Sequence, residues 1–203
     1  MLTWPIASIG WVTSLVQQAD ASQERINEFL DEKPEITNKK KTPDEIHGSI
    51  AFNNVSFTYD DTNITALKNV SFEVESGETL AIIGKTGAGK STILELIGRL
   101  YDVDQGTISI DGKNIENLNL DSLRNSIGYV PQDAFLFSDS IKNNIKFGKT
   151  NASDEEIFEA AKNASVHKNI VGFSKGYDTV LGERGITLSG GQKQRVSIAR
   201  AII

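Results

Sequence analysis

The chain has 203 residues, a formal net charge of −6 at pH 7 and no cysteine. This length is enough for one full domain with extensions, and 38% hydrophobic with 24% charged residues is the composition of an ordinary globular protein. The acidic balance predicts no nucleic-acid partner, because binding to a phosphate backbone depends on Lys and Arg. The lack of cysteine excludes disulfides and thiolate metal sites.

Residues 1–19 carry no charge, although polar residues interrupt the apolar ones. A membrane-spanning helix needs about 20 mostly apolar residues. The stretch therefore fits either the end of a membrane helix leaving the bilayer or a soluble amphipathic helix. Apolar residues keep a helical spacing up to Leu30 while charges appear. We therefore expect one long helix over residues 1–30, the end of a transmembrane or intracellular helix.

Residues 31–47 contain Pro34, Pro43 and the basic run Lys39–Lys41. Prolines and a charge run are typical of a solvated linker rather than of a packed element. We therefore expect a linker over 31–47 and a domain that begins at residue 48.

The domain opens with alternating apolar and polar residues over 50–59 and again over 70–74. Such alternation predicts antiparallel strands that are buried on one face. Asn53 and Asn54 interrupt the first alternation, and we expect a β-bulge there.

The rest of the domain shows the patterns of mixed helices and strands. Residues 80–83 form a short unbroken apolar run, which is typical of a strand buried on both faces. A glycine-rich turn follows, and then a helical pattern over 93–100. Further strands are expected at 107–110 and 127–130, and a Ser-x-x-Glu capping box predicts a helix over 153–164.

The glycine-rich turn fits the pattern G-x-x-x-x-G-K-[ST], between an expected strand and an expected helix. In this pattern glycines let successive backbone N–H groups point at phosphate oxygens, and the helix N-terminus adds a positive dipole. Lys90 would bind the β- and γ-phosphates, Ser91 would ligate Mg²⁺, and Thr92 can reach a phosphate oxygen. The remaining loop residues assigned to nucleotide are Gly84, Lys85, Thr86, Gly87, Ala88 and Gly89. Alone, the loop leaves kinases, GTPases and motor ATPases open.

A second motif, Leu-Ser-Gly-Gly-Gln, occupies residues 188–192 and precedes a helical pattern. Ser189 and Gln192 have the spacing of a capping box, and Gly190 and Gly191 open the first turn to close approach. By itself the motif fits either a well-capped helix or a second anion-binding helix terminus.

The pairing of the two motifs resembles the ATP-binding cassettes of ABC transporters, from about Gly48 to the last residue. The resemblance implies ATP and Mg²⁺ as cofactors and Lys90 and Gln132 as catalytic residues. By the same resemblance, Ser91 and Gln132 would ligate Mg²⁺. Tyr59 would stack on adenine, or else be a strand residue packing inward. Gln132, after Pro131, would sense Mg²⁺ and the attacking water, or else be an ordinary turn amide.

The resemblance also implies partners. In this family two cassettes pair head to tail, and the P-loop of one and the Leu-Ser-Gly-Gly-Gln of the other close on the same ATP. Thr179–Gly185 resembles the loop that contacts the membrane domain in exporters, although it could be a charged surface loop. We expect a second cassette, the transmembrane domain of the same subunit and a membrane as partners. The location would be the inner or plasma membrane, with the cassette on its cytoplasmic side.

The chain departs from the family at its end. Family members continue past the signature helix into a strand that ends in Asp-Glu and a loop with a histidine, whereas this chain ends at Ile203. His47 and His167 precede the signature and match neither position. We expect this fragment to bind ATP without the Walker B aspartate, the catalytic glutamate and the switch histidine. Alone it should be inactive and aggregation-prone, with the central strands of its sheet missing.

The predicted fold is therefore α/β: a P-loop NTPase-like parallel sheet with an antiparallel β subdomain and a helical subdomain, preceded by an N-terminal helix. The domains are expected at 1–30, 31–47 and 48–203. The predicted function is the ATPase module of an ABC exporter half-transporter with an unknown substrate. Two alternatives remain at this point: a soluble ABC ATPase that acts on nucleic acid or ribosomes, and a fragment that binds nucleotide or a partner cassette without catalysis.

Overall fold

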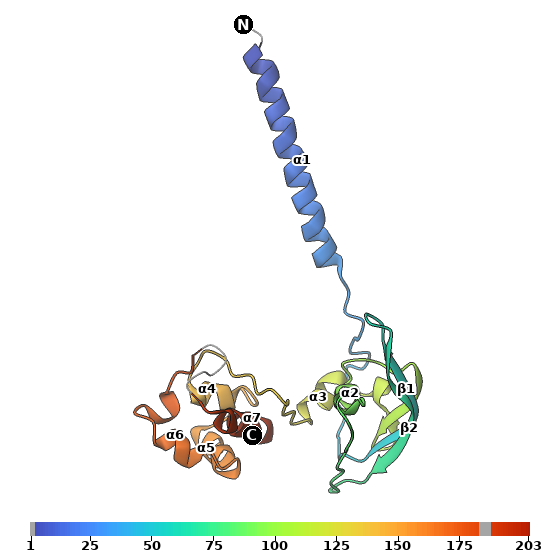
Figure 1. Cartoon of the computed structure of the whole chain (residues 1–203), viewed down its shortest axis with the longest axis vertical. Helices are drawn as coiled ribbons and strands as arrows, with labels where there is room; N and C mark the ends of the chain where they lie inside the picture. Colours follow the sequence, from blue (N-terminus) through green and yellow to red (C-terminus); the bar gives the residue numbers. More distant parts are fainter. Residues whose placement is uncertain (1–2, 183–187) are drawn as a thin grey trace. The chain divides into compact units, whose positions relative to one another are not determined.

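The structure is a computed structural model that describes residues 3–182 and 188–203. It divides into two compact units, residues 1–38 and residues 39–203. Figure 1 traces their elements in chain order.

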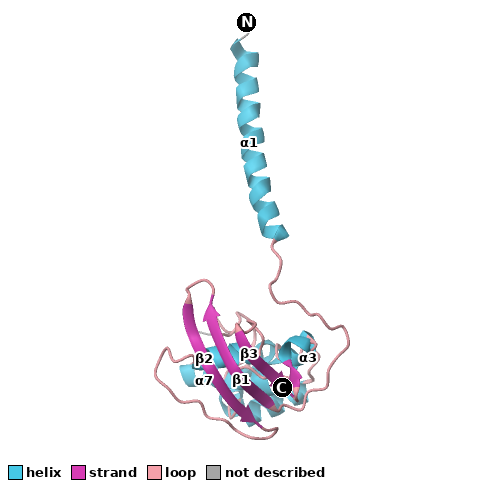
Figure 2. Ribbon diagram, turned by 90° about the vertical axis from the view of Figure 1, so that its right-hand side faces the viewer, coloured by secondary structure: helices cyan, strands magenta, loops and turns pink. Residues whose placement is uncertain are grey.

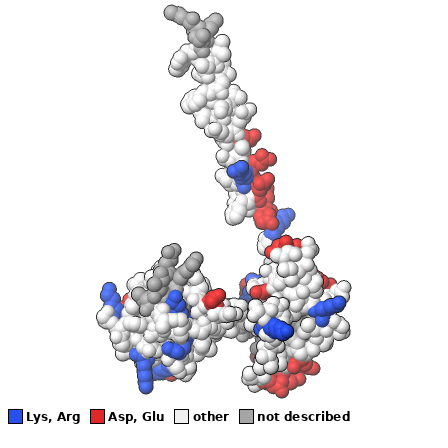
Figure 3. All heavy atoms as spheres, in the orientation of Figure 1, with Lys and Arg blue, Asp and Glu red and all other residues white. Residues whose placement is uncertain are grey.

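The first unit is built on one helix, α1 (Thr3–Asp31), so the long helix expected at the N-terminus is present. Its first half bears no charge, and its second half carries a row of acidic side chains (Figure 3). The apolar side chains of the first half are exposed, including Trp4 at 81% and Trp11 at 67%. Within the described residues no helix is long and apolar enough to cross a membrane.

The second unit begins with a four-stranded sheet of order β2-β1-β3-β4, in which every pair is antiparallel (Figure 2). The strands are β1 (Ile50–Tyr59), β2 (Ile64–Val74), β3 (Gln105–Ile110) and β4 (Lys113–Asn114). The bulge expected at Asn53 and Asn54 is confirmed, because the register of β1 against β2 shifts there and Asn54 has φ 51°.

Many apolar side chains of this sheet and of α2 (Lys90–Ile97) are buried. The glycine that precedes α2, Gly89, lies directly against the backbone carbonyl of Ala66 in β2. The chain continues through the 3₁₀ helix η1 (Ile115–Asn117) into α3 (Leu120–Asn125). The buried apolar residues of this region include Phe52, Val55, Phe57, Leu67, Ile93, Leu96, Ile108, Ile110, Ile115, Leu118, Leu120 and Leu123.

The rest of the second unit is helical, with a core of its own. Its elements are α4 (Ile141–Lys146), α5 (Asp154–Asn163), α6 (His167–Val171), the 3₁₀ helix η2 (Gly176–Asp178) and α7 (Gly190–Ile202). Both predicted capping boxes are confirmed, at the start of α5 and at the start of α7. The apolar faces of these helices meet in one cluster whose members include Leu136, Ile141, Ile145, Ile157, Ala161, Leu181, Val196 and Ala199.

Two strand predictions are wrong. Residues 80–83 and 127–130 form no strand, and Ile83 is 95% exposed. A strand exists only where a neighbour accepts and donates its backbone hydrogen bonds, and no strand of the described chain pairs with either segment. An apolar run such as residues 80–83 forms a buried strand only if neighbouring strands lie beside it, and in the described chain they do not.

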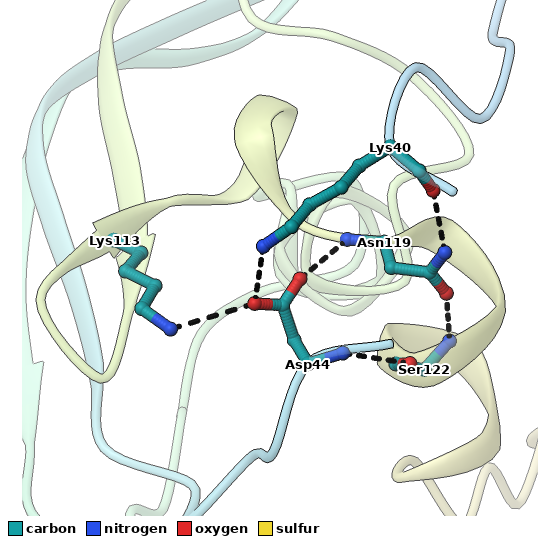
Figure 4. A network of polar contacts seen from close by, with 5 residues as sticks. All are labelled: Lys40, Asp44, Lys113, Asn119 and Ser122. Carbon is teal, nitrogen blue, oxygen red and sulfur yellow. Dashed lines mark hydrogen bonds and ion pairs between the residues drawn. The ribbon is translucent and has the colours of Figure 1, made fainter. Parts of the chain in front are cut away.

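The segment before β1 is more ordered than a solvated linker. The side chain of Asp44 is only 3% exposed and forms ion pairs with Lys40 and Lys113 (Figure 4). It also accepts from the backbone amide of Asn119, and its own amide donates to the hydroxyl of Ser122. These contacts lower the pKa of Asp44 from 3.8 to about 2, chiefly through the hydrogen bond from Lys40. Asp44 therefore fastens this segment to the start of α3.

Candidate nucleotide-binding site

The predicted phosphate loop is an exposed turn that ends at the N-terminus of α2. Gly87 and Gly89 have φ 82° and 78°, in the left-handed region that favours glycine. The N-cap residue of α2 is Gly89, which has no side chain to bond the first amides of the helix. The first N–H groups of a helix have no partner within it, so this terminus offers amide donors and a positive dipole to an anion.

The side chain of Lys90 folds back over the loop. Its ammonium group donates to the backbone carbonyl oxygens of Gly84 at 2.9 Å and Lys85 at 2.8 Å. The positive charge is thereby held against the first residues of the loop. That this charge binds a polyphosphate stays a prediction of the sequence pattern.

Three of the predicted site residues meet in one cavity. Lys90, Ser91 and Gln132 line a hollow of about 410 Å³, although Gln132 lies about 40 residues further along the chain than the other two. Both Ser91 and Gln132 are exposed. Hydroxyl and amide carbonyl oxygens are suitable ligands for Mg²⁺, which prefers hard oxygen donors, so the donor set fits a magnesium–polyphosphate group.

Tyr59 lies at the end of β1 and is half-buried. Its ring is nearly perpendicular to those of Phe57 and Tyr101, with centroid distances of 4.9 and 5.4 Å. Its hydroxyl contacts Thr92 Oγ1 at 2.9 Å and donates to Glu95 Oε2 at 2.7 Å. Burial, together with the bond to Glu95, raises the pKa of Tyr59, and this side chain therefore stays protonated near neutral pH.

The buried hydroxyl of Thr92 thus contacts Tyr59 in this structure. The sequence predicted that Thr92 reaches a phosphate oxygen. The two contacts compete for one hydroxyl group, a constraint that the motif alone could not reveal.

The signature motif forms the start of α7. Ser189 Oγ accepts from the amide of Gln192 at 3.3 Å, and Gln192 Oε1 accepts from the amide of Ser189 at 3.0 Å. A side chain at Gly190 would meet no atom within 4 Å, so the first turn is open to an approaching group. Neither Ser189 nor Tyr59 lines the cavity that Lys90 shares with Gln132.

The signature helix, α7, contacts the residue that precedes Gln132. The side-chain amide of Gln194, in α7, donates to the backbone carbonyl of Pro131 at 3.0 Å. Sequence reasoning missed this bond and also the bond between Tyr59 and Glu95, since neither Gln194 nor Glu95 belongs to a motif. The predicted loop Thr179–Gly185 extends into residues 183–187, which lie outside the described residues.

The comparisons with known proteins decide the family. The family model described as ABC transporter matches residues 67–203, which is more than half of the chain. The chain belongs to the ABC transporter family. The exporter-type cassette expected from the two motifs is thereby supported at the level of the family.

Relatives and a solved structure agree. The chain is 47% identical over 202 residues to the uncharacterized ABC transporter ATP-binding protein YfiB of Bacillus subtilis, covering 100% of the chain and 35% of that protein. It is 43% identical over 204 residues to the heavy metal tolerance protein of Schizosaccharomyces pombe, covering 100% and 24%. A bacterial Atm1-family ABC exporter with ATP bound matches with 41% identity and a TM-score of 0.87, over 98% of this chain and 35% of that one.

This similarity confirms the predicted fold class, because the matched exporter chain shares the fold at a high TM-score. The chain spans about a third of the length of the first of these relatives and of the exporter structure.

Proposed function

We propose that this chain is the ATP-binding cassette of an ABC exporter half-transporter, whose whole protein hydrolyses ATP to drive export. The observation that carries the proposal is the cavity in which Lys90, Ser91 and Gln132 meet at the N-terminus of α2. A lysine charge and a hydroxyl at a helix terminus, with an amide oxygen lining the same cavity, are groups that suit a magnesium-bound triphosphate.

Each proposed residue has a distinct task. Lys90 binds the β- and γ-phosphates through charge-assisted hydrogen bonds. Ser91 and Gln132 ligate Mg²⁺, and the loop Gly84–Gly89 surrounds the phosphates with its amides. Mg²⁺, when bound, neutralises phosphate charge, while Tyr59 supports the adenine ring.

A second cassette completes the site in this proposal. The N-terminus of α7, capped by Ser189 and open at Gly190, offers donors to the triphosphate held by the P-loop of a partner cassette. The names of relatives support a membrane setting, because YheI of Bacillus subtilis is a probable multidrug resistance ABC transporter ATP-binding/permease protein, 43% identical over 204 residues. We place the cassette on the cytoplasmic side of an inner or plasma membrane, beside the transmembrane domain of its own subunit.

Ser189→Arg tests the two-sided model. Sedimentation measures association of the chain with and without Mg-ATP, and calorimetry measures nucleotide affinity of the monomer. We expect the arginine to abolish ATP-driven association and to leave monomer affinity unchanged, with the exposed Ser174→Arg variant as the control. Equal loss of association and of monomer affinity would refute the model.

A further inference from the structure

The hydroxyl of Tyr59 is one member of a three-residue hydrogen-bond chain. It donates to Glu95 Oε2 at 2.7 Å and contacts Thr92 Oγ1 at 2.9 Å. Thr92 and Glu95 lie three residues apart in α2, so they share one face of the helix. Thr92 is 4% exposed and Glu95 is half-buried, so these bonds are partly shielded from water.

Which hydroxyl group donates in each of these hydrogen bonds follows from the number of protons available. An ionised carboxylate only accepts hydrogen bonds, so the single proton of Tyr59 belongs to the bond with Glu95. The contact with Thr92 must then be donated by Thr92, whose single hydroxyl proton is used in it. A phosphate oxygen also only accepts, so the Thr92 hydroxyl cannot donate to Tyr59 and to a phosphate at the same time.

We propose that Glu95 is a positioning residue of the nucleotide site: its carboxylate fixes the Tyr59 ring and, through Tyr59, directs the Thr92 proton away from the phosphates. The proposal rests on the proposed function, in which Tyr59 supports the adenine and α2 receives the phosphates. It adds a link between the base and phosphate ends of the site, made by a residue outside every motif.

Substitutions at Glu95 and Tyr59, tested with one ligand that has a base and one that lacks it, distinguish effects on base binding from effects on phosphate binding. Glu95→Ala removes the acceptor, Tyr59→Phe keeps the ring but removes the hydroxyl, and Glu95→Gln keeps an acceptor oxygen. Calorimetry measures the affinity of the full chain for Mg-ATP and for magnesium tripolyphosphate, which has no base. Glu155→Ala, at an exposed glutamate of α5, is the control.

We expect Glu95→Ala and Tyr59→Phe each to weaken Mg-ATP binding about fivefold, the equivalent of one net hydrogen bond. Tripolyphosphate binding should stay equal or become tighter, because Tyr59→Phe removes the acceptor of the Thr92 proton and Glu95→Ala lets Tyr59 donate to Thr92 instead. Glu95→Gln should restore ATP affinity to within about twofold. The double variant should be no weaker than either single one, since both remove the same bond.

A merely structural role of Glu95 would weaken both ligands equally, and additive losses in the double variant would show that Glu95 does not act through Tyr59. Either result overturns the proposal. If the unaltered chain binds neither ligand, the proposed function itself fails. If the unaltered chain binds both and only the variants behave otherwise than expected, the proposed function stands and the role of Glu95 falls.

Discussion

The carboxylate of Asp44 accepts a hydrogen bond of 2.9 Å from the backbone amide of Asn119, which lies 75 residues further along the chain. The amide of Asp44 donates in turn to the hydroxyl of Ser122, in the first turn of α3. These two hydrogen bonds hold the segment before β1 against the start of α3.

Asp44→Asn should destabilise the domain, and the effect should depend on pH. The folded pKa of Asp44 is about 2 against an ordinary 3.8. A carboxyl group with a lowered folded pKa stabilises the protein above its unfolded pKa and loses this contribution as pH falls through its folded pKa. The difference in melting temperature between wild type and Asp44→Asn should thus be constant above about pH 5 and shrink from pH 4 towards pH 2. A difference that does not vary with pH would contradict the assigned ion pairs.

Gly87 and Gly89 of the phosphate loop allow a controlled comparison of two alanine substitutions. Both have left-handed φ, so alanine at either position is strained by about 1–2 kcal/mol. A side chain at Gly89 would also collide with the Ala66 carbonyl and lie 2.9 Å from Leu67, whereas at Gly87 it would meet nothing within 4 Å. Urea unfolding should therefore show a larger loss of unfolding free energy for Gly89→Ala than for Gly87→Ala. Equal losses would mean that α2 does not start against β2.

Arg200 should resist even a conservative replacement. Its guanidinium donates to the backbone carbonyls of Asn144 at 2.8 Å and Phe135 at 2.9 Å, and to Asn144 Oδ1 at 2.9 Å. A lysine ammonium cannot span these three acceptors. We expect Arg200→Lys to lower the free energy of unfolding by about 1–3 kcal/mol. Arg25→Lys, at an exposed residue of α1, should leave it within about 0.5 kcal/mol, and similar values for the two variants would refute this role.

Local features were the ones that the sequence could predict. The capping boxes at Ser153 and Ser189 depend on four consecutive residues each, and the bulge at Asn53-Asn54 interrupts a visible alternation. The strand expected at 80–83 depends on neighbours that the pattern cannot supply, and it does not form in this structure.

Contacts between distant segments left no trace in the sequence pattern. Nothing about Asp44 in a proline- and lysine-rich stretch indicates that Asn119 will be its partner, and nothing about Glu95 indicates Tyr59. In the candidate site, the sequence pattern assigns the phosphate loop residue by residue because its chemistry requires fixed types at fixed offsets, and this assignment stays a prediction. Polar residues that contact the site residues from outside the loop, such as Glu95, need not be of a fixed type at a fixed offset.

Calorimetric titration of Mg-ATP into the full chain and its Lys90→Ala variant tests the central claim most directly. Loss of the Lys90 ammonium removes charge-assisted bonds worth about 1.5–3 kcal/mol each, so the affinity should fall at least about tenfold, to the point of no measurable binding. Lys175→Ala, at an exposed lysine outside the loop, should bind as the unaltered chain does. Unchanged nucleotide affinity in Lys90→Ala would contradict the assignment of this loop as the ATP site.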